Sequence, residues 1–588
     1  MEAKVEGPTE LRNVTLDDED YVFISPNAAR DIAIPNISVP EMLFQAIDMN
    51  YDIIKNKPWV VDTDTGVSYK FREIKPVAMK IASALTRLGF KKGDVLFFVT
   101  QDAALIYLVN IGVWLCGGAV RGSCHGERRE AYLNQMREVS TSFALCDSET
   151  SASVKWAAEK LDWNVKIISI GGGVEGALSV EEMIEKEDGS AFPKNVKIDP
   201  KEDTLIITNT SGSTGTPKGV MHTHEALVTN FALRGHPKKM KEEDGQERNS
   251  SLMVAVGNFF TSLFSVSNAS LVNGYTFYAS SKYEVKSFMR NLLHYKPDTV
   301  FLHPYSVHEF VQLPELDIHD FTFLKVVSSG GSVFNYATAK ALETKLPHVK
   351  LNLVYGTSEA LLISSTEYDF LAAAEYEYSK TDSTAAGVKY NILQGDTHMT
   401  CGYLDPLVKA KLKDINSGRP LGRNMKGNLW VKTPYLMKGY VSSGEKKDIG
   451  DFKDADGWYD TGDIAYFDDE DFLYVVDRNK FTFKTYMHWV SPTEVEAVIL
   501  KHPDVVSTVV VGVPDPVAGA VAKAFVVIKR GSKVTEDEIK AHVAENTEDY
   551  KHLHGGVSFV ECLPVTSGGK LNRNTLLKQA IAEMRPST

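Results

Sequence analysis

The sequence predicts an α/β protein with a large N-terminal domain of parallel-rich sheets covered by helices and a small α+β C-terminal domain. Apolar runs alternate with helical patterns up to about residue 355, and strands separated by helices imply parallel sheets covered on both faces. Beyond Lys411 the pattern changes to short strands with Asp/Gly turns, and beyond Arg478 to a compact set of strands with one helix. Because 588 residues exceed what one hydrophobic core usually organises, at least two domains are expected.

The individual elements follow from the periodicity of apolar residues. Strands of the large domain are expected at residues 95–100, 143–146, 165–170, 205–208, 275–279, 299–303, 324–328 and 351–355. A helix is expected between residues 74 and 88, where apolar residues recur at helical spacing and Gly89 stands where a C-terminal cap belongs. In the small domain we expect strands at 506–511, 524–528 and 557–560 and a helix at 536–545.

One uncharged stretch, residues 103–120, reaches the 18-residue lower limit for a membrane span. It contains Asn110 and three glycines and follows an ordinary strand. We therefore expect a buried helix against a sheet and no transmembrane segment.

Composition limits the classes of partner and the compartment. A net charge of −13 argues against a general nucleic-acid or anionic-membrane surface. Five scattered cysteines without CxxC spacing fit free thiols in a reducing compartment. The N-terminus lacks an apolar signal core and the C-terminus does not end in Ser-Lys-Leu, so a cytoplasmic location is expected. The sequence predicts no oligomeric state.

The strongest motif is residues 210–219, Thr-Ser-Gly-Ser-Thr-Gly-Thr-Pro-Lys-Gly, directly after an apolar strand. Small residues leave backbone N–H groups free to face an anion, which suits a polyphosphate. A mobile linker is the alternative, but linkers rarely end in Pro-Lys-Gly and run straight into a helix-like segment such as residues 225–234. The order Lys-Gly also excludes a Walker A loop.

Further motifs follow in order. They are Ser329-Gly330-Gly331, Tyr355-Gly356-Thr357-Ser358-Glu359, Tyr459-Asp460-Thr461-Gly462-Asp463, Asp477-Arg478 and Ser567-Gly568-Gly569-Lys570. Together with the loop they resemble the adenylate-forming superfamily, which includes acyl-CoA synthetases, 4-coumarate:CoA ligases, beetle luciferases and peptide-synthetase adenylation domains. Residues 1–39 are acidic and contain Pro and Asn, so we expect them to form an extension packed on the surface. The resemblance implies an adenylation domain at 40–477 that binds ATP and the acid, and a mobile C-terminal domain at 478–588.

Activation of a carboxylate by ATP requires groups that bind the β- and γ-phosphates, a Mg²⁺ ligand, and groups that bind ribose and adenine. It also requires a cation where negative charge develops, at the attacking carboxylate and the α-phosphate. By resemblance, Glu359 binds Mg²⁺, Asp463 and Arg478 hold the ribose, and Lys570 bridges the attacking carboxylate and the α-phosphate. Lys480 falls at the hinge. The remaining ATP-binding candidates are Thr210, Ser211, Gly212, Ser213, Thr214, Gly215 and Lys218 for the phosphates, Gly330, Gly331 and Tyr355 for adenine, and Gly356, Thr357 and Ser358 beside them.

The substrate pocket is expected to be apolar. Phe259 or Phe260 stands where the family usually places a histidine, and His303 and Tyr305 complete the candidate lining. No Arg or Lys is evident to fix a second substrate charge, so a fatty or aryl carboxylic acid is favoured over an amino acid. The alternative is that these are core residues.

The chain departs from the family after the hinge, where relatives read Lys-x-Lys-Gly-[Phe/Tyr]-Gln. Met487 replaces the glycine that leaves room for pantetheine, and Trp489 replaces the glutamine. Lys484 is kept, as in luciferase-like relatives, and by this resemblance is a candidate catalytic residue beside Lys570 and Glu359. Three functions therefore stay open: a ligase that uses ATP, Mg²⁺ and CoA to make an acyl-CoA, a luciferase-like enzyme that oxidises the adenylate, and a catalytically silent binding or scaffold protein.

Two weaker motifs are assigned structural roles. Gly171, Gly173 and Gly176 satisfy GxGxxG, but a lone fingerprint has many false positives and a surface turn is favoured over a dinucleotide site. His222 and His224 follow the phosphate loop, and His552 and His554 lie near the C-terminus. Neither pair shows further ligand partners in the sequence, so structural histidines are favoured over metal sites.

Overall fold

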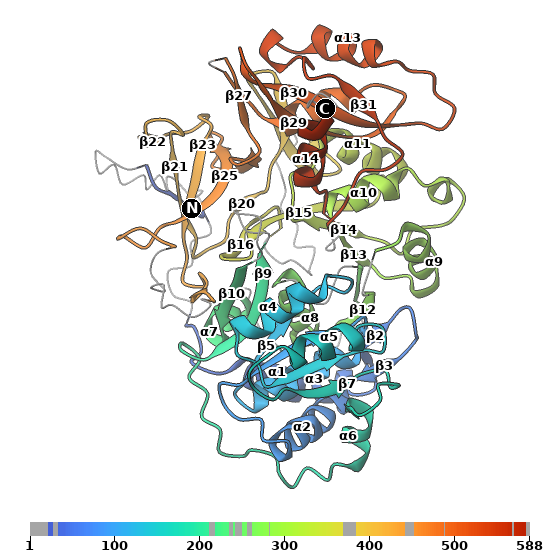
Figure 1. The fold of residues 1–588 in the computed structure, drawn as a ribbon, viewed down its shortest axis with the longest axis vertical. Coiled ribbons are helices and arrows are strands. Elements are labelled where there is room, and N and C mark those ends of the chain that lie inside the picture. The colour runs from blue at the N-terminus through green and yellow to red at the C-terminus, as the bar shows by residue number, and fades with distance from the viewer. Residues whose placement is uncertain are drawn as a thin grey trace, which may run out of the picture.

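The computed structural model describes residues 21–26, 33–210, 218–233, 239–240, 250–255, 261–280, 283–367, 384–441, 452–486, 488–566 and 570–583. These residues form a large α/β part with two extensive sheets, an antiparallel sheet beside it, and a small C-terminal domain, coloured orange to red in Figure 1. The predicted fold class is therefore confirmed.

An eight-stranded sheet carries the phosphate-loop motif at one edge. Its strands β9, β5, β4, β6, β7 and β8 are parallel, while β10 and β24 add antiparallel pairs beyond β9. In sheet order the strands are β24 (Gly439–Tyr440), β10 (Lys218–Thr223), β9 (Thr204–Thr210), β5 (Ala119–Gly122), β4 (Val95–Val99), β6 (Phe143–Cys146), β7 (Lys166–Ser169) and β8 (Leu178–Ser179).

The connection after the phosphate loop differs from the expectation of a direct run into a helix. Strand β10 comes first and pairs with β9, with Lys218 opposite Thr210, and only then does α7 (His224–Ala232) begin. Val220 and His222 are buried on alternate positions of β10, which is the period of a strand. The loop therefore joins the two strands of a hairpin.

The nine-stranded sheet carries the remaining motifs of the large part. Strands β15, β14, β13, β11, β12 and β2 are parallel, so their carboxyl ends meet at one edge. In sheet order the strands are β20 (Tyr403–Leu404), β16 (Leu361–Ser365), β15 (Lys350–Thr357), β14 (Val326–Gly330), β13 (Thr299–Leu302), β11 (Ser251–Ala255), β12 (Thr276–Ser280), β2 (Pro58–Asp62) and β3 (Ser68–Lys70).

Helices cover these two sheets. They are α1 (Val39–Ile54), α2 (Phe71–Arg87), α3 (Leu105–Leu115), α4 (Arg129–Glu138), α5 (Ser151–Glu159), α6 (Val180–Lys186), α7, α8 (Thr261–Val272), α9 (Val285–Tyr295), α10 (Pro304–Val311), α11 (Tyr336–Lys345) and the 3₁₀ helix η1 (Pro314–Asp317). The expected apolar face of α2 is buried, and Gly89 has φ +89° after its end. Residues 105–114 of α3 are all buried, which confirms the buried-helix interpretation. Among the described helices none has the length and apolar character that crossing a bilayer requires.

Antiparallel sheets contain most of the strands between residues 384 and 478. The larger one contains β1 (Phe23–Ile24), β21 (Lys409–Lys413), β22 (Pro420–Leu421), β23 (Gly427–Lys432), β25 (Tyr459–Phe467) and β26 (Leu473–Arg478), and a smaller one contains β17 (Thr384–Ala385), β18 (Val388–Leu393) and β19 (Asp396–Met399). Strand β1 belongs to the N-terminal extension, and its Phe23 ring stacks on Phe467 with centroids 4.0 Å apart.

The small domain has its own sheet and its own hydrophobic clusters. Its elements are β27 (Phe483–Thr485), β28 (His488–Val490), α12 (Pro492–Ile499), β29 (Val505–Asp515), β30 (Gly519–Ile528), α13 (Glu536–Asn546), the 3₁₀ helix η2 (Asp549–Lys551), β31 (Val557–Phe559) and α14 (Arg573–Glu583).

Buried ion pairs fasten the small domain to the large one. The carboxylate of Glu494 lies 2.5 Å from Lys426 Nζ, and Lys551 Nζ lies 3.0 Å from the carboxylate of Asp396. The His308 ring also contacts the carbonyl of Val506. These contacts set the orientation in which Lys570 meets the large domain.

Candidate active site

Tyr355, Asp463 and Arg478 form the centre of the candidate site. The Tyr355 hydroxyl donates to Asp463 Oδ2 at 2.6 Å, and Arg478 Nε lies 2.7 Å from Asp463 Oδ1. Asp463 and Arg478 are paired residues of β25 and β26, while Tyr355 comes from β15 of another sheet. Two sheets therefore meet at one buried carboxylate.

Electrostatics keep this group in defined protonation states. Burial raises the pKa of Asp463, and the charge of Arg478 and the Tyr355 hydrogen bond oppose that shift. Burial together with Asp463 raises the pKa of Tyr355 well above its ordinary value, so the phenol remains a donor. Arg478 is partly exposed, so its guanidinium remains reachable by a ligand.

Glu359 lies at the turn between β15 and β16. It is 7% exposed, and its Oε1 accepts a hydrogen bond of 3.0 Å from the Tyr440 hydroxyl. Lys218 Nζ, at the end of the phosphate loop, lies 5.1 Å from the centroid of the Tyr440 ring. The predicted phosphate and metal residues thus share one neighbour.

His222 and Tyr440 are positioning residues that the motifs did not reveal in these roles. His222 Nε2 donates to the carbonyl of Ser358 at 2.6 Å, and burial lowers the pKa of this histidine to about 4. The ring is therefore neutral and holds the chain next to Glu359. Tyr440 reaches Glu359 because β24 pairs with β10, and no local sequence spacing encodes that pairing.

Lys570 enters the site from the small domain. A Cβ placed on Gly331 would lie 3.2 Å from Lys570 Cε and 3.0 Å from His303 Nδ1, so all three residues adjoin. His303 Nδ1 in turn donates to the carbonyl of Gly330 at 3.0 Å. Burial, with the charge of Arg478, lowers the pKa of Lys570 to about 8, while Asp463 and Glu359 oppose the shift.

Glycine is required at both positions of this β14 end. A Cβ on Gly330 would lie 2.5 Å from the carbonyl oxygen of Val354, and Gly331 has φ +94°. A side chain at Gly330 would therefore clash with the neighbouring strand, and the backbone of Gly331 favours glycine.

Some predicted residues fall outside the described part of the chain. They are Ser211, Gly212, Ser213, Thr214 and Gly215 of the phosphate loop, Phe259 and Phe260 of the substrate pocket, Met487, and Ser567, Gly568 and Gly569 before Lys570. Thr210 ends β9, and Gly356 and Thr357 end β15. Tyr305 lies on α10, two residues beyond His303.

The two hinge-region lysines occupy different environments. Burial and the charge of Arg478 lower the pKa of Lys480, and Asp463 and Glu359 oppose that shift, so Lys480 lies within the electrostatic field of the site. Lys484, the other candidate catalytic lysine, donates to Asn416 Oδ1 at 3.1 Å, and its Nζ lies 4.8 Å from the centroid of the Trp489 ring.

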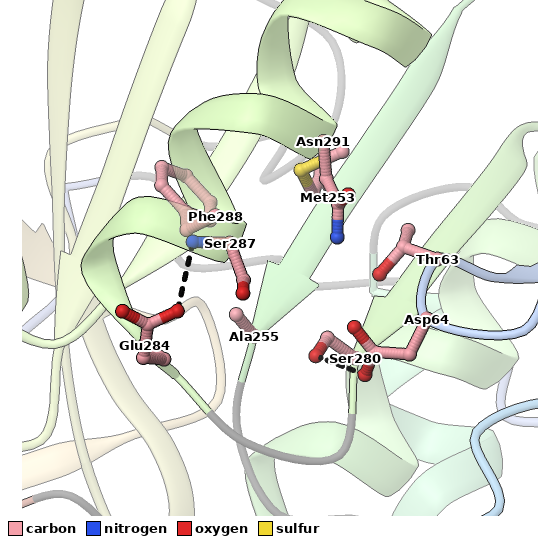
Figure 2. A pocket seen from close by; sticks show the side chains of 9 residues that line it. All are labelled: Thr63, Asp64, Met253, Ala255, Ser280, Glu284, Ser287, Phe288 and Asn291. Atoms are coloured by element: carbon pink, nitrogen blue, oxygen red, sulfur yellow. Dashed lines mark hydrogen bonds between the residues drawn. The ribbon is translucent and has the colours of Figure 1, made fainter.

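A separate cavity of about 200 Å³ lies at the carboxyl ends of β11 and β12, beside the first turns of α9. Figure 2 shows its lining. The residues are Thr63, Asp64, Met253, Ala255, Ser280, Glu284, Ser287, Phe288 and Asn291. None of them belongs to the Tyr355, Glu359, Asp463 and Lys570 group.

The two weaker motifs of the large part have the structural roles expected of them. Gly171, Gly173 and Gly176 have φ between +74° and +76° in an irregular turn after β7. His224 is buried and its Nδ1 accepts from the Val39 N–H at 3.2 Å. Together with the His222 contact, this confirms structural histidines.

Comparison with known proteins agrees with the geometry. The family model described as AMP-binding enzyme matches residues 54–441, and that of the AMP-binding enzyme C-terminal domain matches residues 494–570. The 4-coumarate–CoA ligase 3 of Oryza sativa subsp. japonica is 28% identical over 88% of this chain and 89% of its own. The luciferin 4-monooxygenase of Nipponoluciola cruciata is 32% identical over 66% of this chain and 67% of its own.

Solved structures show the same fold. The anthranilate CoA ligase AuaEII in complex with anthranoyl-AMP superposes with a TM-score of 0.77 at 20% identity, covering 93% of this chain and 98% of that one. ATP-bound MatB from Rhodopseudomonas palustris superposes with a TM-score of 0.77 at 21% identity, covering 93% and 100%. With both family models matched in order across the two domains, the chain belongs to the AMP-binding enzymes, the adenylate-forming family of acid–CoA ligases and luciferases.

Proposed function

We propose that this protein uses ATP to convert a carboxylic acid into an acyl-adenylate with release of pyrophosphate, and then transfers the acyl group to CoA. The observation that carries the proposal is the position of Lys570. Its side chain comes from the small domain and adjoins Gly331 and His303, within the field of Asp463, Glu359 and Arg478. Residues from both domains thus converge where one nucleotide would bind.

In the first step a carboxylate oxygen attacks the α-phosphorus of ATP as the bond to pyrophosphate breaks. The Lys570 ammonium would stabilise negative charge on the carboxylate and the α-phosphate during the attack. Lys218 and the amides of residues 210–219 would hold the departing phosphates. Asp463 would accept hydrogen bonds from the ribose hydroxyls, with Arg478 as a further donor.

Glu359 fits a Mg²⁺ ligand. It is a buried carboxylate whose Oε1 is oriented by Tyr440, and no described basic residue forms an ion pair with it. A hard oxygen donor of this kind is what Mg²⁺ prefers, and the ion would neutralise charge on the ATP phosphates.

For the acid, we propose a fatty or aryl carboxylate. The relatives named above include ligases of 4-coumarate and anthranilate, both aryl acids. His303 would face such a substrate as a neutral ring, because burial and the charge of Lys570 lower its pKa to about 4.

The second step depends on which molecule, CoA or oxygen, reacts with the adenylate. The hairpin of β27 and β28 carries Lys484, Tyr486 and Trp489, with Tyr486 at φ +53° and 58% exposed. Rotation of the small domain would bring this bulky hairpin toward the active site. Relatives carry smaller residues at the corresponding positions, which leave room for pantetheine. That observation favours, as a second candidate, oxidation of the adenylated substrate by O₂ with release of AMP, as in a luciferase. A silent scaffold protein would form no adenylate.

One experiment separates these functions. The protein is incubated with ATP, Mg²⁺, a mixture of fatty and aryl acids, and CoA, and products are identified by mass spectrometry. AMP with an acyl-CoA supports the ligase; acyl-adenylate without thioester, with oxygen uptake or light, supports the second candidate. Bound ATP with neither adenylate nor pyrophosphate for any acid would contradict both.

A further inference from the structure

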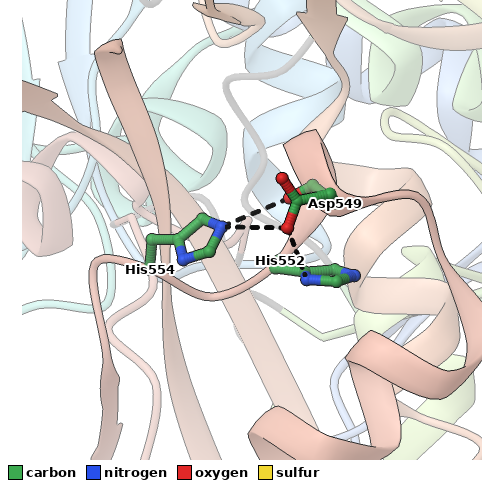
Figure 3. A group of neighbouring side chains, drawn as sticks. All are labelled: Asp549, His552 and His554. Carbon is green, nitrogen blue, oxygen red and sulfur yellow. Dashed lines mark hydrogen bonds and ion pairs between the residues drawn. The ribbon is translucent and has the colours of Figure 1, made fainter. Parts of the chain in front are cut away.

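A second group of polar side chains lies on the small domain, at the turn that contains η2. Asp549 begins the 3₁₀ helix η2, and His552 and His554 follow it, so the three form an Asp-x-x-His-x-His sequence (Figure 3). One ligand atom from each lies within 4.8 Å of the others, and no other group of this kind occurs in the described part of the chain. The two histidines alone had no evident partner in the sequence, and the turn supplies the third.

The separations fit a metal ion. His552 Nδ1 lies 3.3 Å and His554 Nε2 lies 3.8 Å from Asp549 Oδ1. Ligand atoms bound tetrahedrally at about 2.0–2.2 Å lie roughly 3.4 Å apart, so the first separation already matches. The second requires a side-chain movement in which His554 Nε2 gives up its 3.3 Å contact with the Asp549 carbonyl.

A hydrogen bond from Nε2 of the His552 ring orients the other ring nitrogen, Nδ1. The Nε2 of His552 donates to the carbonyl of Thr547 at 3.2 Å, so Nδ1 is the nitrogen that carries the lone pair when the ring is neutral. That nitrogen faces the Asp549 carboxylate, an arrangement that needs a cation or a proton between the two atoms. A histidine held by a backbone carbonyl on its other nitrogen is the usual second-shell arrangement of metal sites.

We propose that Asp549, His552 and His554 bind a divalent transition metal ion such as Zn²⁺. Two imidazoles and one carboxylate select borderline metals over Mg²⁺, so this site is chemically distinct from the one proposed at Glu359. The three ligands leave at least one position for water. Asp549 and His554 are exposed, so the ion can enter directly from solvent.

The site lies on the turn that fastens the small domain to the large one. Within η2, the Tyr550 ring stacks on His488 of β28 with centroids 4.3 Å apart, and Lys551 pairs with Asp396 of the large domain. A bound ion would join both ends of this turn and hold Lys551 in its present position. Metal binding should therefore also stabilise the docked orientation of the small domain.

The test uses the full-length untagged protein without nucleotide. ZnCl₂ is titrated by calorimetry, and Co²⁺ is titrated with detection of visible absorption bands of a low-symmetry site. We expect one site per chain, with no corresponding Mg²⁺ binding. His552→Gln, His554→Gln and Asp549→Ala should each weaken Zn²⁺ affinity about 10- to 100-fold or more, since loss even of an outer-shell partner has effects of that size.

His319→Gln, which removes an exposed histidine of the large domain, is the matched control and should leave affinity unchanged. Thermal unfolding without metal checks that every variant folds, and Zn²⁺ should raise the melting temperature of the wild type but not of the three ligand variants. The proposal is overturned if the wild type binds no Zn²⁺ below about 100 μM, a generous limit for a three-ligand site, or if the ligand variants bind as well as the control.

Discussion

The hydroxyl of Tyr355 donates a 2.6 Å hydrogen bond to Asp463, although 108 residues separate them. This bond joins the end of the nine-stranded sheet to the antiparallel sheet that precedes the small domain. It leaves Asp463 oriented by Tyr355 on one oxygen and by Arg478 on the other. In the proposed site, the ribose would meet a carboxylate whose orientation is already fixed.

We predict that Asp463→Ala weakens ATP binding itself. Hydrogen bonds to a charged group contribute about 1.5–3 kcal/mol, so the dissociation constant should rise roughly 10- to 100-fold. Equilibrium binding of a fluorescent ATP analogue measures the change. Asp469→Asn, an exposed turn residue, is the control, and unchanged affinity in Asp463→Ala would refute the ribose assignment.

Lys570→Ala should slow adenylate formation about 10²- to 10³-fold while sparing ATP binding, because the ammonium acts mainly on charge that develops in the transition state. Single-turnover pyrophosphate release reports the rate. Lys578→Ala removes an exposed lysine from α14 of the same domain and should behave as wild type. Equal losses in both variants would point to a general effect of lowered charge.

The lowered pKa of Lys570 predicts a pH dependence. The group is an ammonium below its pKa of about 8 and a neutral amine above it, so kcat/KM for adenylation should be level below about pH 8 and fall as pH rises further. Lys570→Arg keeps its charge through this range, so whatever activity it retains should not show that fall. A fall that persists in the arginine variant would assign it to another group.

Gly331→Ala should lose adenylation activity as well as stability. Its φ of +94° costs an alanine about 1–3 kcal/mol, and the new methyl group would crowd His303 and Lys570. Gly418→Ala separates the two effects, because Gly418 has φ +70° with nothing within 4 Å of the added Cβ. We expect a similar loss in denaturant unfolding from both variants, and loss of adenylate formation only from Gly331→Ala.

Glu494→Gln should loosen the small domain. Burial alone would raise the pKa of Glu494, but His398, Lys426 and Lys551 outweigh burial and hold the pKa well below its ordinary value. The ionised pair therefore stabilises the docked domain at neutral pH, and this stabilisation is lost as pH falls toward the lowered pKa.

Removing one partner of a buried pair typically costs about 3–5 kcal/mol, so cleavage by a protease near residues 478–486 should become faster at neutral pH. Glu545→Gln, an exposed residue of α13, is the control. Cleavage of the Glu494 variant at the wild-type rate would show that other contacts suffice to hold the domain.

Much of the fold follows from local pattern. The apolar run at residues 143–146 became β6 without change of bounds, and the helical spacing from Ile74 to Leu85 became the buried face of α2. Such elements can be predicted because their buried residues recur at a regular spacing within one segment of the chain. Strand β10 was missed because a short hairpin strand is defined by its pairing with β9 as much as by its own six residues.

The sequence by itself determined which residue types are available for the chemistry and the order of the motifs that place the chain in its family. It could not determine that Tyr355 donates to Asp463, that Tyr440 supports Glu359, or that Lys570 adjoins Gly331 and His303. Those relationships arise from sheet register and from the docking of one domain on another. Both depend on contacts between segments far apart in the chain, which periodicity within a segment does not record.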